Sequence, residues 1–316
     1  MADKTIIAVV GSTGAQGGGL VRAILADPEK RFAARAITRK TDSDKAQALA
    51  AAGAEVVAAD ANDPASLRRA FTGAHGAFCV TAFWEHFSAD RDLEQAATMA
   101  RATKAAGVKH VVWSTLEDTR RWFPLDDPRL KTLQGKYKVP HFDAKGEADA
   151  IFAAEAAPTS YLIAAFYWEN FIFFGQGPRR GADGKVVLAL PLAGGKLPGI
   201  AAEDIGRCAL GIFRRGQEAA GQRFGIAGEV LSGPEYAAAL SRHLGEPVSF
   251  HDMSFDEYRA LGFPGADDMG NMYEHHALVG EEFLALRSPK LARALNPALQ
   301  SFDTWLAANA KRIPLG

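Results

Sequence analysis

Residues 11–18 read Gly-Ser-Thr-Gly-Ala-Gln-Gly-Gly and directly follow the apolar, β-branched run Thr5–Val10. The first, fourth and seventh of these residues are glycines, and they lie between a predicted strand and a predicted helix, Gly17–Ala26. In this pattern the first glycine allows a sharp turn, the second lets a pyrophosphate approach the backbone, and the third lets helix and strand pack closely. The helix N-terminus adds unpaired N–H groups and a partial positive charge. The stretch predicts a dinucleotide site that includes Gly11, Ser12, Thr13, Gly14, Ala15 and Gln16.

Short apolar strands and helices are predicted to alternate as far as Ser114. Two of the helices end at a glycine that can cap them, Gly53 and Gly107. Strands separated by helices of this length indicate a parallel sheet with helices on both faces, which is the doubly wound α/β fold of Rossmann type. The predicted strands are Ala33–Thr38, Glu55–Ala59, Gly76–Thr81 and Val108–Ser114, and the predicted helices are Ala46–Ala52, Ala65–Phe71 and Arg91–Ala106.

The pattern changes after residue 115. Thr119–Pro140 contains several prolines among charged residues and is expected to be a long irregular loop, a kind of segment that is often mobile. A helix at Asp143–Ala156 and a strand at Tyr161–Ala165 follow, and then shorter elements with a turn at Pro191–Gly199. We expect a Rossmann domain at 1–165 and a smaller C-terminal α/β domain at 166–316, with part of 200–228 returning to the first domain.

Composition excludes several classes of protein. The chain has 316 residues, with 36 Lys and Arg against 37 Asp and Glu, so its formal charge is −1. A nucleic-acid-binding protein would carry an excess of basic residues, so we expect no nucleic-acid partner. No apolar run approaches the ~18–20 residues that span a bilayer, and the 2 cysteines cannot form a disulfide framework. We therefore expect a cytoplasmic protein without a membrane partner.

The end of the second predicted strand indicates which dinucleotide would bind. An NAD site has Asp or Glu about 20 residues after the glycines to accept from the ribose hydroxyls, but this strand ends Thr38-Arg39-Lys40. A guanidinium pairs with a 2′-phosphate that a carboxylate would repel. Arg39 and Lys40 therefore favour NADP(H), although they could also be ordinary surface cations. Asp60 and Ala61, after the third strand, are expected near the adenine, where the residues before Pro64 could equally cap a helix.

The fourth strand leads into Thr81, Ala82 and Phe83, at the sheet edge where ligands of such folds bind. In the segment where short-chain reductases have Tyr-x-x-x-Lys, this chain has His141 and Lys145, four residues apart and so on one helix face. Lys145 is the candidate catalytic residue. His141 could transfer a proton near neutral pH, or it could be a structural residue after Pro140.

With these motifs the chain resembles the NmrA-like family of atypical short-chain dehydrogenases/reductases, and within it the HSCARG-type NADPH sensors. The resemblance implies a Rossmann domain with a small C-terminal domain, NADP(H) binding without the usual catalytic tyrosine, and a redox-sensing role through partner proteins. It also implies cofactor contacts from Tyr167, Trp168, Glu169 and Asn170. The matching stretches are Gly11–Gly18, Thr38-Arg39, Trp84-Glu85, His141–Glu147, Tyr167–Asn170 and Leu261–Ala266.

Two functions follow from the sequence. The first is a regulator that reports the NADPH/NADP ratio, because a full cofactor cradle accompanies an incomplete proton-transfer pair. The alternative is an NADPH-dependent reductase of a quinone, carbonyl or imine-like molecule. A protein partner, a small-molecule substrate and a homodimer all stay open. No metal site is expected, because the adjacent His275 and His276 would point about 100° apart on a helix.

Overall fold

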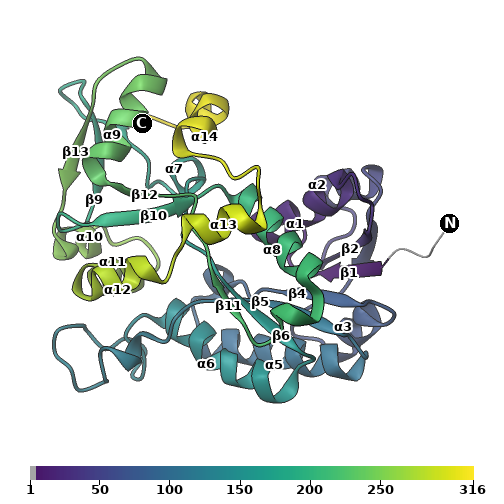
Figure 1. Ribbon diagram of the computed structural model, residues 1–316. Coiled ribbons are helices and arrows are strands. Elements are labelled where there is room, and N and C mark those ends of the chain that lie inside the picture. Colours follow the sequence, from purple (N-terminus) through teal and green to yellow (C-terminus); the bar gives the residue numbers. More distant parts are fainter. Residues whose placement is uncertain (1–4) are drawn as a thin grey trace. The chain divides into compact units, whose positions relative to one another are not determined.

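The computed structural model describes residues 5–316, which form two compact units (Figure 1). The first unit contains the residues up to Asp118 together with His141–Ile163 and Glu203–Phe224, and the second contains Thr119–Pro140, Ala164–Ala202 and Gly225–Gly316. The predicted division into a Rossmann domain at 1–165 and a smaller domain at 166–316, with part of 200–228 returning to the first, stays a prediction.

The first unit is built on a seven-stranded sheet with the order β11-β6-β5-β4-β1-β2-β3. All neighbouring pairs from β3 to β6 are parallel, which confirms the predicted doubly wound α/β fold. Each predicted strand of this sheet is present, with ends that differ by one or two residues. The strands are β1 (Thr5–Val9), β2 (Phe32–Thr38), β3 (Glu55–Ala58), β4 (Gly76–Cys79), β5 (His110–Thr115), β6 (Thr159–Ile163) and β11 (Arg223–Gly225).

Helices cover both faces of this sheet (Figure 1). On one face the apolar side chains of α3, α5 and α6 share a core with β1, β4 and β5, where the Trp113 ring stacks on Phe152 at 4.4 Å. On the other face α8 approaches α1 so closely that a Cβ on Gly206 would lie 2.2 Å from the backbone of Gly19. The helices are α1 (Ala15–Ala26), α2 (Asp44–Ala51), α3 (Pro64–Phe71), α4 (Phe83–His86), α5 (Ala89–Ala105), α6 (Pro140–Glu155) and α8 (Ala202–Arg215).

The second unit has two three-stranded sheets, β12-β10-β7 and β13-β9-β8. Its strands are β7 (Phe166–Tyr167), β8 (Arg179–Arg180), β9 (Val186–Leu190), β10 (Lys196–Ile200), β12 (Glu229–Ser232) and β13 (Val248–Asp252). Its helices are α7 (Asn170–Phe173), α9 (Gly233–Leu244), α10 (Phe255–Ala260), α11 (Ala266–Val279), α12 (Glu281–Ala285), α13 (Pro289–Leu295) and α14 (Phe302–Asn309).

The predicted turn at Pro191–Gly199 is wrong at its C-terminal end, because β10 begins at Lys196 and forms the centre of a sheet. Pro198 and Gly199 are turn signals in the sequence. In the structure Gly199 is needed for close packing, since a Cβ there would lie 2.2 Å from Trp168 Nε1 and 2.4 Å from the Tyr236 hydroxyl.

The segment 119–140 has little regular structure, as predicted, but it packs closely within the second unit. The Lys138 ammonium is buried and donates to the carbonyl oxygens of Leu125, Asp127 and Leu130 at 3.1, 2.8 and 2.6 Å. The Asn271 amide donates to two further carbonyl oxygens of the segment. Buried carbonyl groups need hydrogen-bond partners. In this segment, side chains supply partners that regular secondary structure would otherwise provide.

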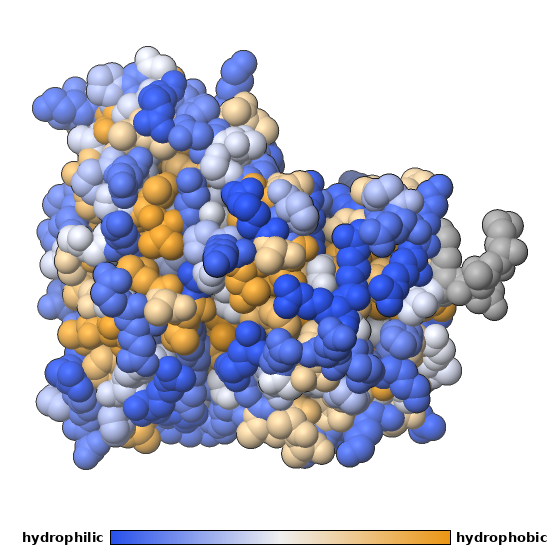
Figure 2. All heavy atoms as spheres, in the orientation of Figure 1, coloured by the Kyte–Doolittle hydropathy of each residue, from blue (hydrophilic) through white to orange (hydrophobic). Residues whose placement is uncertain are grey.

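Of the helices in residues 5–316, none has both the length and the apolar character needed to cross a lipid bilayer. Hydrophilic residues cover most of the face drawn in Figure 2, with groups of apolar residues between them.

Candidate functional site

The turn after β1 has the geometry of an anion cradle. Gly11 has φ +65°, in the left-handed region that favours glycine, and its carbonyl accepts from the Gly14 amide at 2.9 Å. A Cβ on Gly17 would lie 2.4 Å from the Gly11 carbonyl oxygen, so α1 can approach the turn this closely only with a glycine there. The turn therefore brings the N-terminus of α1 directly against the end of β1.

The N-terminus of α1 has no capping side chain and no acidic residue in its first turn. The neighbouring helices α2, α3 and α5 are each capped by a side chain, from Ser43, Asp63 and Ser88 respectively. An uncapped helix N-terminus offers N–H groups and a partial positive charge to an anion. This end of α1 therefore fits a phosphate group.

The other residues predicted in this turn differ in exposure. Ser12 is fully buried, and its amide and hydroxyl both donate to the Ile37 carbonyl, at 3.3 and 2.9 Å. It thereby ties the turn to β2. Gly14 and Ala15 are exposed, and Thr13 and Gln16 are partly exposed. A ligand could therefore reach residues 13–16 and also Gly11, which is exposed.

Arg39 directly follows β2, and its Nη2 lies 2.7 Å from Glu85 Oε1 of α4. Both side chains are about half exposed, at 56% and 51%. Lys40 is exposed beside them. Two cations thus stand at the carboxyl end of β2, and one of them already has a carboxylate partner.

Asp60 is held in a local network at the end of β3. Its Oδ1 accepts from the amide and the side chain of Asn62, both at 2.8 Å, and Gln95 donates to Asn62 at 3.2 Å. Ala61 lies between them and is partly exposed. The cap of α3 is Asp63, so the capping interpretation of this turn is confirmed for that residue. The predicted contact of Asp60 and Ala61 with adenine stays a prediction.

Lys145 lies in a buried polar cluster where β4 ends. Lys145 is 9% exposed, and its ammonium donates to the hydroxyl of Thr81, which donates to Asp92 Oδ2 at 2.6 Å. The Lys145 ammonium also lies 3.7 Å from the same carboxylate oxygen. Burial lowers the pKa of Lys145 below its usual value, and the Asp92 carboxylate opposes that shift.

The cluster extends to His86, which ends α4. His86 Nδ1 accepts from the Ser88 amide at 3.2 Å, so its Nε2 carries the proton in the neutral ring. That Nε2 lies 3.7 Å from Asp92 Oδ1, and within residues 5–316 neither atom has a hydrogen-bond partner. Asp92 is therefore the central anion of the cluster. Neither it nor His86 was predicted as a site residue.

His141 is in the first turn of α6, and its ring packs among aromatic side chains. The ring centroids of Trp84, Phe83 and Phe142 lie 4.8, 5.8 and 4.8 Å from it. His141 is 6% exposed. The structure thus places Phe83 and His141 together, beside exposed Ala82. Proton transfer by His141 stays a prediction.

The residues Tyr167–Asn170 belong to the second unit. The Trp168 indole is fully buried and donates to the Tyr236 hydroxyl at 3.3 Å. The Glu169 carboxylate accepts from the Trp305 indole at 3.0 Å and from the Ala202 amide at 2.8 Å. Tyr167 and Asn170 are partly exposed. The side chains of Trp168 and Glu169 thus hold the second unit together, and cofactor contact by the four residues stays a prediction.

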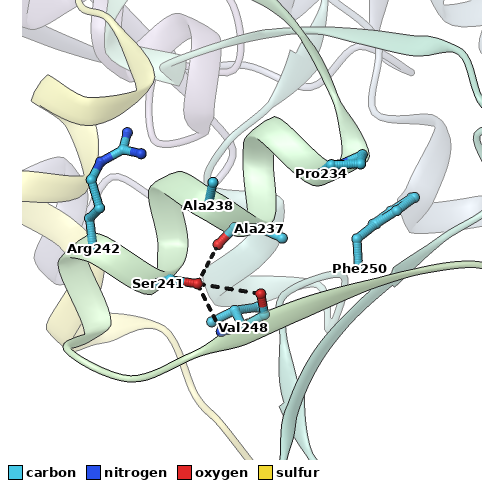
Figure 3. Close-up of a pocket in the computed structure, with 7 residues that line it drawn as sticks. All are labelled: Pro234, Ala237, Ala238, Ser241, Arg242, Val248 and Phe250. Atoms are coloured by element: carbon cyan, nitrogen blue, oxygen red, sulfur yellow. Dashed lines mark hydrogen bonds between the residues drawn. The ribbon is translucent and has the colours of Figure 1, made fainter.

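The second unit also has a groove of about 650 Å³ between α9 and β13. Figure 3 shows Ser241 bridging these elements: its hydroxyl donates to Ala237 and accepts from the Val248 amide, both at 2.8 Å. Arg242 at the rim is paired with Asp303 at 2.8 Å. None of the predicted site residues lines the groove. Among residues 5–316, no cluster of three His, Cys, Asp or Glu side chains could hold a metal ion.

Known proteins with similar sequences and structures are consistent with the doubly wound α/β fold. A malD oxidoreductase of Malbranchea aurantiaca, with an NmrA-like family domain, is 34% identical over 221 residues, which are 66% of this chain and 64% of that protein. An NAD(P)H azoreductase of Xenophilus azovorans is 28% identical over 313 residues, 96% of this chain and 98% of that protein. The crystal structure of NmrA, a negative transcriptional regulator, in complex with NADP superimposes with a TM-score of 0.77 and 23% identity, over 96% of this chain and 94% of that one.

The model of the NmrA-like family matches residues 3–306, which include the anion cradle, the Lys145 cluster and nearly all of the second unit. A match of this length is not confined to the glycine turn that many nucleotide-binding proteins share. The chain belongs to the NmrA-like family.

Proposed function

We propose that this chain binds NADP(H) on its first unit and uses it to reduce a quinone, carbonyl or imine-like small molecule. The observation that carries the proposal is the buried ammonium of Lys145 at the carboxyl end of β4, hydrogen-bonded to Thr81. Ligands of doubly wound folds bind at this edge of the sheet. A ligand bound at this edge would lie near the Lys145 ammonium. The full-length similarity to an azoreductase supports reduction as the reaction class.

The features of the first unit fit the proposed cofactor. The uncapped N-terminus of α1 suits a pyrophosphate. Arg39 stands at the end of β2, where a 2′-phosphate could pair with its guanidinium. Lys145 would donate to the ribose hydroxyls and orient the nicotinamide, and the small residues Thr81 and Ala82 leave room for its approach. The bound cofactor would supply a hydride.

His141 stands where short-chain reductases have the tyrosine that donates a proton, and this limits which substrates the site could reduce. When a hydride adds to a carbonyl carbon, the carbonyl oxygen needs a strong, well-placed proton donor. His141, Lys145 and Asp149 lie at four-residue intervals on one face of α6. Asp149 is already bonded to Trp113, Thr115 and Arg223, which leaves His141 and Lys145 as the candidate donors. A quinone or an azo compound spreads the incoming charge over a conjugated system and can take its proton more slowly. The site therefore suits conjugated, electron-poor acceptors better than simple ketones.

The test is NADPH oxidation by the purified protein over a panel of quinones, azo dyes, imines and simple carbonyls. We expect turnover of conjugated acceptors and its loss in Lys145→Met. Lys104→Met is the matched control, because Lys104 is an exposed lysine of α5. Equal turnover in both variants would contradict a role for Lys145.

Cofactor choice is tested separately by calorimetry. Arg39→Ala should weaken NADPH binding by ~1–3 kcal/mol and barely change NADH binding, because only the 2′-phosphate takes a charge-assisted bond there. The control is Arg68→Ala, at the exposed C-terminal turn of α3. Equal losses for the two dinucleotides would show that Arg39 does not select between them.

A second candidate is a regulator that responds to the NADPH/NADP ratio. The observation that favours it is that His141 occupies the tyrosine position, with its ring packed against those of Phe83 and Trp84. This function requires dinucleotide binding without turnover on the whole panel, together with an oligomeric state or partner affinity that differs between NADPH and NADP. Turnover that depends on Lys145 would exclude it as the main function.

A further inference from the structure

The ion pair between Arg39 and Glu85 crosses the mouth of the anion cradle. Arg39 follows β2, and Glu85 lies in the single helical turn, α4, that follows β4. In the sheet, β1 lies between β4 and β2, so the pair joins the two strands that flank the cradle. The two side chains are 46 residues apart in the sequence, and the strand order of the sheet brings them together.

The backbone around Glu85 is fixed. The Glu85 amide donates to Ala82 at 2.9 Å, and the Phe87 amide donates to Phe83 at 2.7 Å. Phe83 is 3% exposed, which anchors the turn in the unit. In contrast, the Glu85 carboxylate itself is half exposed, and within residues 5–316 its ion-pair partner is Arg39. The carboxylate can therefore leave Arg39 without any movement of the backbone.

We propose that Glu85 is a built-in competitor for the 2′-phosphate of the cofactor, an inference that rests on the NADP(H) binding proposed above. A carboxylate oxygen 2.7 Å from the guanidinium stands where a phosphate oxygen would bind. A phosphate carries more negative charge and more acceptor oxygens than a carboxylate, so it displaces Glu85 from Arg39. A 2′-hydroxyl has no charge and leaves the pair closed. Glu85 thus lowers the affinity of the chain for NADPH but not for NADH. It therefore reduces the preference of the chain for NADPH over NADH.

The expected effect is modest because the pair is exposed. Exposed ion pairs typically change an equilibrium constant by about 1.5- to 5-fold. Glu85→Gln keeps the size of the side chain and removes its charge, so it should tighten NADPH binding by about that factor and leave NADH binding unchanged. The same substitution should have no effect in the Arg39→Ala background, where nothing is left to compete for.

The experiment is calorimetric titration of the full chain with NADPH and NADH at fixed salt, because screening weakens exposed charge pairs. The matched control is Glu55→Gln, since Glu55 is 52% exposed and pairs with Arg35 at 2.8 Å. Arg35 and Glu55 lie opposite each other at the end of the β2–β3 pairing that is remote from Arg39. This control should leave both affinities unchanged.

Each of the following outcomes would overturn the inference. Weaker binding of both dinucleotides by Glu85→Gln would mean that Glu85 holds the cofactor in place. Tighter binding of both, or an effect that persists without Arg39, would mean a general charge effect. Ordinary binding with no change in NADPH affinity would refute this inference alone, whereas no binding of any dinucleotide by the unmodified chain would refute the proposed function as well.

Discussion

The buried pair of Lys145 and Asp92 predicts a large and specific effect of removing one charge. Asp92→Asn keeps an oxygen that can accept from Thr81 but leaves the ammonium without its nearest carboxylate, 3.7 Å away. At that distance, with an effective dielectric constant of about 20, the attraction is about 4 kcal/mol. Breaking a buried pair from one side typically costs about 3–5 kcal/mol. We therefore expect the free energy of unfolding to fall by about 3–4 kcal/mol in Asp92→Asn.

Urea denaturation of four proteins measures this effect: the unmodified chain, Asp92→Asn, Lys145→Met and the double variant. In the Lys145→Met background, Asp92→Asn should cost less than about 1 kcal/mol, because no buried cation is left unpaired. Asp90→Asn is the control, since Asp90 is an exposed residue in the same helical turn. If Asp92→Asn costs as much without Lys145 as with it, the two charges are not coupled, and Asp92 acts only through its hydrogen bonds.

Three further predictions concern other parts of the chain. Burial, with a smaller contribution from His75, lowers the pKa of His110 from 6.5 to about 4. Between these pH values the unfolded chain takes up a proton that the folded chain does not, so the free energy of unfolding should fall by about 3 kcal/mol from pH 6.5 to pH 4. An equal fall in His110→Gln would contradict this. Gly17→Ala should destabilise the chain by about 1–3 kcal/mol in thermal unfolding and weaken NADPH and NADH binding alike, because its Cβ would meet the Gly11 carbonyl; unchanged affinity would show that the turn is not the cradle. Lys138→Met removes the partner of three carbonyl groups and should speed proteolysis within 119–140, whereas unchanged cleavage would mean that other contacts hold the segment.

The sheet of the first unit could be predicted because its signals are local. The apolar runs, the glycine turn and the residues that end each helix lie within a few positions of the elements they define. The helix predicted at Gly17–Ala26 begins two residues too late. The prediction relied on apolar side chains, whereas in the structure α1 already begins at Ala15. In the second unit Pro198 and Gly199 gave a misleading local signal, because their role depends on Trp168 and Tyr236, which are distant in sequence.

The candidate site was only partly predictable. Arg39 and Lys145 could be found by their distance from recognisable motifs, but their partners could not. Asp92 is 53 residues before Lys145 and reads in the sequence as an ordinary acidic residue in the first turn of a helix. Glu85 belongs to a short stretch that marks the family, but nothing in the sequence pairs it with Arg39. Such pairs are set by the order of the strands, which a single sequence with local signals does not specify.

Two ion pairs at the edge of the sheet, Arg39–Glu85 and Lys145–Asp92, differ in how they should affect cofactor choice and stability. Arg39 and Glu85 are half exposed, so exchanging the partner of Arg39 costs little, and under the proposed function it would change which dinucleotide binds. Lys145 and Asp92 are buried, so neither charge can change its partner without a large loss of stability. Substitutions at the first pair should shift the preference between NADPH and NADH without unfolding the chain. Substitutions at Lys145 or Asp92 should lower both the stability of the chain and the proposed reductase activity. A loss of turnover in such a variant therefore indicates a role in the reaction only when the folded fraction has been measured in the same sample.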